Sequence, residues 1–243
     1  MKTSIVRQTW VAALCSFSLL TLSSAVKAAD APVQEFSAEY SVNYNGASFG
    51  TTAQQLLKRK GDKVWTFNST VDGPLVGVEE QADFTWQGCV TRPVQYTFDR
   101  SGIGPSKTVN ILFDWDKNLA HYKTKKESGD YSLQPGVMDK LSLQLAVRCQ
   151  LIQGKTDLNF ISADEDGLNA TPFVVEGDET VHTELGDLKT VKIKRVRPNS
   201  NRETYVWLAP SHDYLMVKSL QIEKQKDRIE LNILSFSNTD GTR

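Results

Sequence analysis

Histidine and cysteine are both scarce in this chain of 243 residues, with three of each. The histidines are His121, His182 and His212, and none lies within four residues of another histidine or of a cysteine. Zinc sites usually contain such ligands in close pairs, so the sequence does not predict a metal site. We expect no metal and no other cofactor.

The chain also lacks an excess of positive charge. It has 28 Lys and Arg against 29 Asp and Glu, a formal net charge of −1. Three of the basic residues, Lys2, Arg7 and Lys27, fall within the first 28 residues, and without them the balance is 25 against 29. Nucleic-acid-binding proteins carry a clear basic excess, so we do not expect a nucleic-acid partner.

No apolar run approaches the length of a membrane-spanning helix, which takes about 20 residues. A short apolar run over 11–22 follows a charged start and precedes Val26-Lys27-Ala28. This order is typical of a secretory signal peptide that is cleaved after Ala28. We expect residues 1–28 to be removed, and residues 29–243 to form a single β-rich domain without an integral membrane segment.

The compartment predicted from this signal is the periplasm. Cys15 lies inside the apolar run, and Leu14 before it is not the small residue that lipoprotein processing requires, so we expect no lipid anchor. Cys89 and Cys149 remain after removal of the signal. A pair of cysteines in an oxidising compartment favours one disulfide, although two separate buried thiols are an alternative. The chain has no C-x-x-C pair, which makes a redox role improbable.

Short segments with alternating apolar and polar residues fill most of the remaining chain. In the first, Phe36, Ala38, Tyr40 and Val42 alternate with polar residues up to the turn pair Asn45-Gly46. This period of two predicts a strand with one buried face. Similar segments, separated by turn residues, predict strands over 49–58, 65–71, 82–86, 94–98, 109–115, 119–125, 157–162, 173–176, 179–183, 188–196, 202–208, 214–224 and 228–236.

One segment has a helical pattern instead. Asp139 to Ile152 follows Pro135-Gly136 and ends before Gly154, and Asp139 is a suitable N-cap. Apolar residues recur at spacings of three and four and predict one buried face, made of Met138, Leu141, Leu145, Cys149 and Ile152. The fold predicted is mainly β: a curved antiparallel sheet or incomplete β-barrel, with one α-helix (about 139–152) packed against its concave or open side.

Several segments resemble a known family in their order along the chain. They are Phe36-x-Ala38-x-Tyr40 with Gly46 and Gly50, the Asp139-x-Leu141-Ser142 helix that ends in Arg148, Thr183-Glu-Leu-Gly186, Thr190-x-Lys192, and Tyr205-x-Trp207-Leu-Ala-Pro210 followed by Tyr214-Leu215 and Lys218. Together they resemble the exported bacterial family of unknown function DUF3108, from about Phe36 to Phe236. The resemblance implies an exported, β-rich envelope protein, and it carries over no catalytic residues.

Motifs for catalysis are weak. Ser211-His212-Asp213 has the residue types of a hydrolase triad, but triads assemble from distant positions, and we expect these adjacent side chains to point apart in a turn. Gly154-Lys155-Thr156 resembles the end of a phosphate loop, but the preceding segment is helical and Cys149 stands where that loop needs glycine. The sequence therefore predicts no catalytic residue.

Basic residues gather on two predicted neighbouring strands, at Lys192, Lys194, Arg195, Arg197 and Arg202. A solvated sheet face is the commoner outcome for such a group. Beside an apolar pocket, the same residues would receive lipid phosphates or an acidic partner. We take Lys194, Arg195 and Arg202 as candidates for ligand binding.

Three functional hypotheses follow. The first is a non-catalytic periplasmic envelope protein that binds an apolar or amphipathic, lipid-like ligand or another envelope component. The second is a scaffold or adaptor in an envelope protein complex, which would act through exposed sheet edges. The third is a hydrolase of envelope material, which the sequence supports least. A cavity lined by apolar side chains would favour the first hypothesis, and a cleft with two facing carboxylates would favour the third.

Overall fold

A computed structural model describes residues 31–198 and 200–238. The predicted signal peptide, residues 1–28, lies outside the described residues. Within the described part, no helix is long and apolar enough to cross a membrane.

The described chain is mostly strand, as its alternating pattern predicts. The strands are β1 (Phe36–Tyr44), β2 (Ala47–Arg59), β3 (Val64–Asp72), β4 (Val76–Gln87), β5 (Val90–Gly102), β6 (Lys107–Asp114), β7 (Leu119–Thr124), β8 (Ser128–Ser132), β9 (Val137–Asp139), β10 (Leu158–Asp164), β11 (Gly167–Thr183), β12 (Gly186–Arg195), β13 (Arg202–Ala209), β14 (Leu215–Glu223) and β15 (Asp227–Asn238). The helix α1 spans Leu143–Ile152, and a short 3-10 helix spans Pro210–His212.

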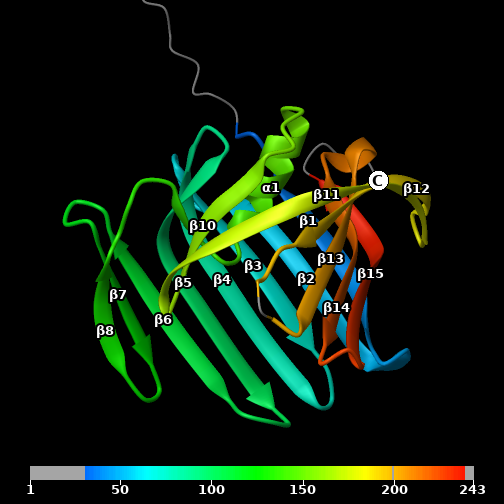
Figure 1. The fold of residues 1–243 in the computed structure, drawn as a ribbon, viewed down its shortest axis with the longest axis horizontal. Helices are drawn as coiled ribbons and strands as arrows, with labels where there is room; N and C mark the ends of the chain where they lie inside the picture. Colours follow the sequence, from blue (N-terminus) through cyan, green and yellow to red (C-terminus); the bar gives the residue numbers. More distant parts are fainter. Residues whose placement is uncertain (1–30, 199, 239–243) are drawn as a thin grey trace, which may run out of the picture. The chain divides into compact units, whose positions relative to one another are not determined.

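All 15 strands belong to one large, open, curved sheet, in the order β8-β7-β6-β5-β4-β3-β2-β1-β15-β14-β13-β12-β11-β10-β9 (Figure 1). Two series of antiparallel hairpins, β1–β8 and β10–β15, are joined where β1 pairs with β15. The single parallel pair is β9 with β10. The predicted class, a mainly β protein with a curved antiparallel sheet and one helix, is confirmed.

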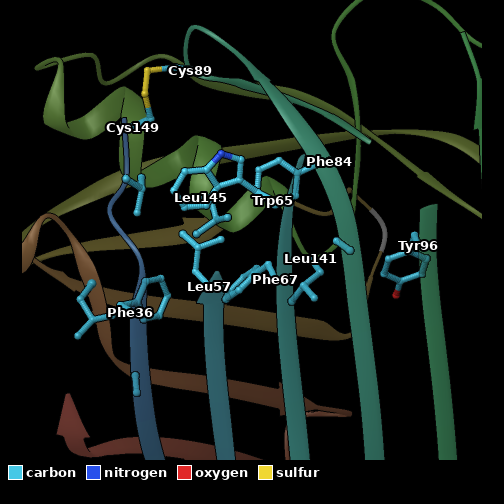
Figure 2. Packing of buried hydrophobic residues seen from close by; sticks show 14 of the residues in the cluster. Phe36, Leu57, Trp65, Phe67, Phe84, Cys89, Tyr96, Leu141, Leu145 and Cys149 are labelled. Carbon is cyan, nitrogen blue, oxygen red and sulfur yellow. A yellow bond between two sulfur atoms is a disulfide. The ribbon is translucent and has the colours of Figure 1, made fainter. Parts of the chain in front are cut away.

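The inner face, which we define as the sheet face that carries the core and packs against α1, follows directly from the alternation. In β1, Phe36, Ala38 and Tyr40 are buried, while the residues between them are at least partly exposed. Trp65 and Phe67 of β3 are buried in the same core. Leu145 of α1 lies beside Trp65 and Leu57, as Figure 2 shows.

Helix α1 begins four residues later than predicted. Asp139 ends strand β9, which pairs with Ile161–Ala163 of β10. Its Oδ1 accepts hydrogen bonds from the backbone N–H groups of Leu141 (2.9 Å) and Ser142 (2.7 Å). Asp139 thus stabilises the turn before the helix. The predicted helix start was wrong because an aspartate makes the same side-chain hydrogen bonds to backbone N–H groups in a turn as it does at a helix N-cap.

The helix is also buried on two sides, whereas one apolar face was predicted. Leu145 and Cys149 join the main core, and Leu143, Val147 and Leu151 join a second apolar cluster with residues of β10, β12 and β13. The inclusion of Ile152 in the buried face was wrong, because its side chain at the C-terminal end of the helix is 42% exposed. A helix covered on both sides is held firmly between two parts of the sheet.

Two further strand predictions need correction. The predicted strands 173–176 and 179–183 are one strand, β11, with a register shift between Val175 and Gly177. Gly177 has a φ of 141°, which a glycine tolerates and which favours a bulge over a turn. Strands β8 and β9 were not predicted. They have five and three residues, and an alternation of apolar and polar residues cannot be recognised over so short a segment.

The predicted cysteine pair lies close together. Cys89 and Cys149 are at disulfide distance, with Cα atoms 5.3 Å apart, and Figure 2 shows the two sulfur atoms joined. The bond links the turn between β4 and β5 to the second half of α1.

Candidate functional site

A cavity of about 480 Å³ lies between α1 and the inner face of the sheet. Its apolar lining comes from both the helix and the strands and includes Phe36, Phe67, Val147, Phe173, Leu208 and Leu231. Polar side chains, among them Gln55, Ser69 and Gln144, line the same space. We call this space the helix cavity; its volume falls within the range of small-molecule sites.

Three arginines from the end of β12, the following loop and the start of β13 line the helix cavity: Arg195, Arg197 and Arg202. Arg195 donates from Nη2 to Thr171 Oγ1 at 3.4 Å, and Arg197 donates from Nη1 to Thr204 Oγ1 at 3.0 Å. Arg202 is paired with the Glu223 carboxylate at 2.5 Å. These three side chains form what we call the arginine wall.

Burial and mutual repulsion both act on the arginine wall. Burial, and then the charges of Arg195 and Arg202, lower the pKa of Arg197 to about 10. Burial and the charge of Arg202 also lower the pKa of Arg195 from its usual range. The lowered pKa values of Arg195 and Arg197 still leave both groups charged at neutral pH, so the wall is a local concentration of positive charge.

The structure separates the predicted basic group by strand alternation. Arg195, Arg197 and Arg202 line the helix cavity, whereas Lys192 and Lys194 lie on the opposite face of β12. Lys194 Nζ is 2.8 Å from Glu203 Oε1, and Lys192 Nζ is 2.9 Å from Glu179 Oε1. Of the three ligand-binding candidates, Arg195 and Arg202 are therefore in the cavity lining and Lys194 is not.

Arg148 ends the helical segment of the family resemblance but was not among the predicted binding residues, and it also lines the helix cavity. It is only 5% exposed, and its guanidinium carbon lies 4.7 Å from the ring centroid of Phe36. Its Nε donates to the Asp213 carbonyl at 3.0 Å, while Nη1 has no hydrogen-bond partner in the described structure. Burial lowers the pKa of Arg148 to about 10. The family resemblance gave Arg148 no role, but its spacing of seven residues from Leu141 could have placed it on the buried face of the helix.

The acidic side chain in the cavity lining is Glu80 of β4. It accepts a hydrogen bond from the Tyr96 hydroxyl at 2.6 Å. The pKa of Glu80 is raised to about 7, mainly by burial and to a smaller extent by the nearby Asp139, while the Tyr96 hydrogen bond and Lys140 oppose the shift. Glu80 therefore changes charge near neutral pH, in contrast to an exposed glutamate.

Glu80→Gln is expected to gain stability over the wild type as pH rises. The folded state keeps the Glu80 proton to about pH 7, while the unfolded chain releases it near its ordinary value of 4.5. The folded wild type thus binds more protons across this window, so its stability falls with rising pH. From about pH 4.5 to about pH 8, the variant should gain about 3 kcal/mol relative to the wild type in urea unfolding. A difference independent of pH would contradict the assignment.

The histidines lie apart from the helix cavity. His121 contacts Asp130 at 2.7 Å, and His182 contacts Asp187 at 2.6 Å. No group of three or more His, Cys, Asp or Glu side chains arranged for a metal ion occurs among the described residues. Ser211 Oγ lies 2.9 Å from His212 Nδ1, so the expectation that these two side chains point apart was wrong. Both are exposed or partly exposed at the surface turn, and no carboxylate completes a triad on His212 in the described chain.

Comparison with known proteins decides the family. The family model of a protein of unknown function, DUF3108, matches residues 39–225. The chain belongs to the DUF3108 family. The resemblance seen in the sequence is thus confirmed, and the match includes the arginine wall and α1 while ending before β15. No curated protein matches the sequence.

Two solved structures are similar to this DUF3108 protein at low sequence identity, and the first of them supports its fold. A β-barrel-like protein from Brucella abortus, of the domain of unknown function DUF1849, is 11% identical with a TM-score of 0.52; the match covers 86% of this chain and 99% of that one. A Bacteroides fragilis protein with a YmcC-like fold is also 11% identical, with coverage of 84% and 95% and a TM-score of 0.30. The Brucella structure supports the β-barrel-like architecture. A shared fold does not indicate function, which has to be inferred from the site.

Proposed function

We propose that this DUF3108 protein is a non-catalytic binding protein that holds an amphipathic, lipid-like molecule in the helix cavity. The observation that carries the proposal is a space of about 480 Å³ with apolar walls and charged groups, between α1 and the inner face. Phe36, Phe67 and Phe173 would cover an apolar chain, and the polar groups would orient the rest of the ligand.

The hydrolase hypothesis gains no support from this cavity. Among the described residues that line it, Glu80 is the only carboxylate. Paired carboxylates are what glycoside hydrolysis needs, and one group cannot act as both partners.

The periplasm is the compartment we propose for this function. The signal-like segment 1–28 supports export, and so does the Cys89–Cys149 pair, because disulfides persist in oxidising compartments. Export would place the binding protein beside the lipids of the cell envelope. The mass of the purified protein tests this: loss of residues 1–28 is expected, and an intact N-terminus would contradict it.

Filling the cavity tests the binding proposal. Ser69 of β3 lines the helix cavity, and Ser69→Trp would place an indole ring in it. We expect the affinity for a fluorescent fatty-acid probe to fall by about tenfold or more, the equivalent of about 1.4 kcal/mol or more. Titration of the probe, followed by its fluorescence, measures the change.

Thr70→Trp is the matched control. Thr70 is the next residue of the same strand and faces the opposite side of the sheet, beside Gln54 and Glu79. Both positions are half-buried, so general damage to β3 would affect both variants. Probe binding that survives in both variants would place the ligand elsewhere. An equal loss in both would attribute the effect to damage of β3 and would remove the support for binding in the cavity.

One observation favours the scaffold hypothesis as a second candidate. Leu75 and Ile103, on neighbouring hairpin ends, are 45% and 68% exposed, and the Ile103 N–H donates to the Leu75 carbonyl at 2.7 Å. Adjacent exposed apolar side chains are typical of contact surfaces, although two residues make a small patch. A role as scaffold would predict that Leu75→Ser with Ile103→Ser disrupts co-purification of an envelope protein while probe binding is kept.

A further inference from the structure

We infer that the ligand of the helix cavity is an anion whose phosphate or carboxylate group binds to the arginine wall, Arg195, Arg197 and Arg202. This inference rests on the proposed function and adds the chemical class of the ligand. It predicts which end of an amphipathic molecule is recognised, and by which side chains.

The charges that line the helix cavity do not balance within the described protein. Five cationic side chains line it: Lys140, Arg148, Arg195, Arg197 and Arg202. Lys140 has a carboxylate partner in Asp164 at 3.0 Å, and Arg202 has one in Glu223. The other three arginines have no carboxylate partner among the described residues, and Glu80, the acid in the lining, holds its proton to about pH 7. The cavity therefore has an excess of positive charge.

Unused hydrogen-bond donors point to the same conclusion. Nε of Arg195 and Nη1 of Arg148 are buried and have no hydrogen-bond partner in the described structure. A buried donor on a charged group is costly unless an acceptor satisfies it. Both donors belong to side chains that line the helix cavity, so an anionic ligand there would supply the missing acceptor.

The described part of the protein does not offer a carboxylate for this role. The Asp164 charge opposes the lowering of the Arg195 pKa only weakly, and the Asp164 carboxylate is bound to Lys140. The contacts of Arg195 and Arg197 are instead the neutral hydroxyls of Thr171 and Thr204. Guanidinium groups held beside hydroxyls, with their forks partly free, suit the planar and bidentate recognition of phosphate or carboxylate.

The test uses four probes that separate the head group from the chain. Dodecyl phosphate, dodecanoate and dodecanol share one alkyl chain, and inorganic phosphate has none. Isothermal titration of the full-length mature protein with each probe is expected to show that both anionic amphiphiles bind about tenfold or more tightly than dodecanol, the strength of one charge-assisted contact or more.

Charge-removing variants assign the preference to residues. Arg195→Gln with Arg197→Gln should abolish the preference for anions, so that dodecyl phosphate and dodecanoate bind to this variant no more tightly than dodecanol does. Lys194→Gln is the control: it removes one positive charge from the same strand but on the opposite face, where Lys194 is paired with Glu203. This control variant should keep the full preference.

The outcomes distinguish this inference from the proposed function. Equal binding of dodecanol and the anionic probes would overturn the anion inference while the amphipathic cavity stands. Binding of inorganic phosphate as tightly as dodecyl phosphate would keep the arginine wall as a site for free anions and refute the lipid-like ligand. A failure of all four probes to bind would refute both. A preference that survives in the Arg195 and Arg197 variant would refute the arginine wall.

Discussion

Replacement of both Cys89 and Cys149 by alanine is expected to lower the free energy of unfolding by about 4 kcal/mol. The two residues are 60 apart in the sequence, and a cross-link that closes a loop of this length restricts the unfolded chain strongly. The enclosed segment contains β5 to β9 and most of α1, so the bond also fixes the helix over the sheet. Urea unfolding monitored by tryptophan fluorescence measures the loss.

Reduction of the wild type separates the cross-link from the packing of the sulfur atoms. Cys149 is only 1% exposed, and its replacement by alanine also removes a buried atom. Wild-type protein unfolded under reducing conditions keeps both side chains and loses only the bond. It should lose most of the same stability; if reduction changed the midpoint by less than the error, the two thiols would be separate in the native protein.

Leu145→Ala is expected to lower the free energy of unfolding by about 3 kcal/mol. Leu145 is fully buried and lies beside Leu57 and Trp65 between helix and sheet, as seen in Figure 2. The truncation removes buried methyl groups and leaves a cavity that the surrounding strands cannot readily fill. Chemical unfolding of the variant gives the change directly.

Ile152→Ala is the matched control on the same helix. Its side chain is 42% exposed, so its truncation should change stability by no more than about 0.5 kcal/mol. Similar losses for the two variants would show that α1 is not anchored through Leu145, and the helix would then be a poor wall for a cavity.

The strands were the most predictable part of the fold, because one buried face leaves a period of two in the sequence. Strand β1 has the predicted bounds, Phe36–Tyr44, and the hairpins on either side of the β1–β15 pair follow their turn residues. Predictions failed where one residue type is compatible with two local structures. Asp139 stabilises a turn after a strand with the same hydrogen bonds that would cap a helix, and Gly177 breaks the pattern of β11 without ending it.

The candidate site was predictable only in part. The basic group on 192–202 was visible, and strand alternation explains why Arg195 faces the cavity while Lys194 does not. The pairing of strands far apart in the sequence decides what Arg195 faces, and no local pattern contains that information. Arg148 was not predicted to line a site, because an arginine on an apolar helix face usually extends its charged end into solvent. Here its guanidinium group is buried over the Phe36 ring and beside the Asp213 carbonyl.

Native mass spectrometry of the protein purified from its own host, before and after mild organic extraction, tests the central claim most directly. A lipid-sized additional mass that is lost on extraction and restored by an anionic amphiphile is the expected result. It would also reveal the class of the natural ligand. A single mass for the unliganded protein, with no gain on incubation with envelope lipids, would contradict the claim that the helix cavity is a ligand-binding site.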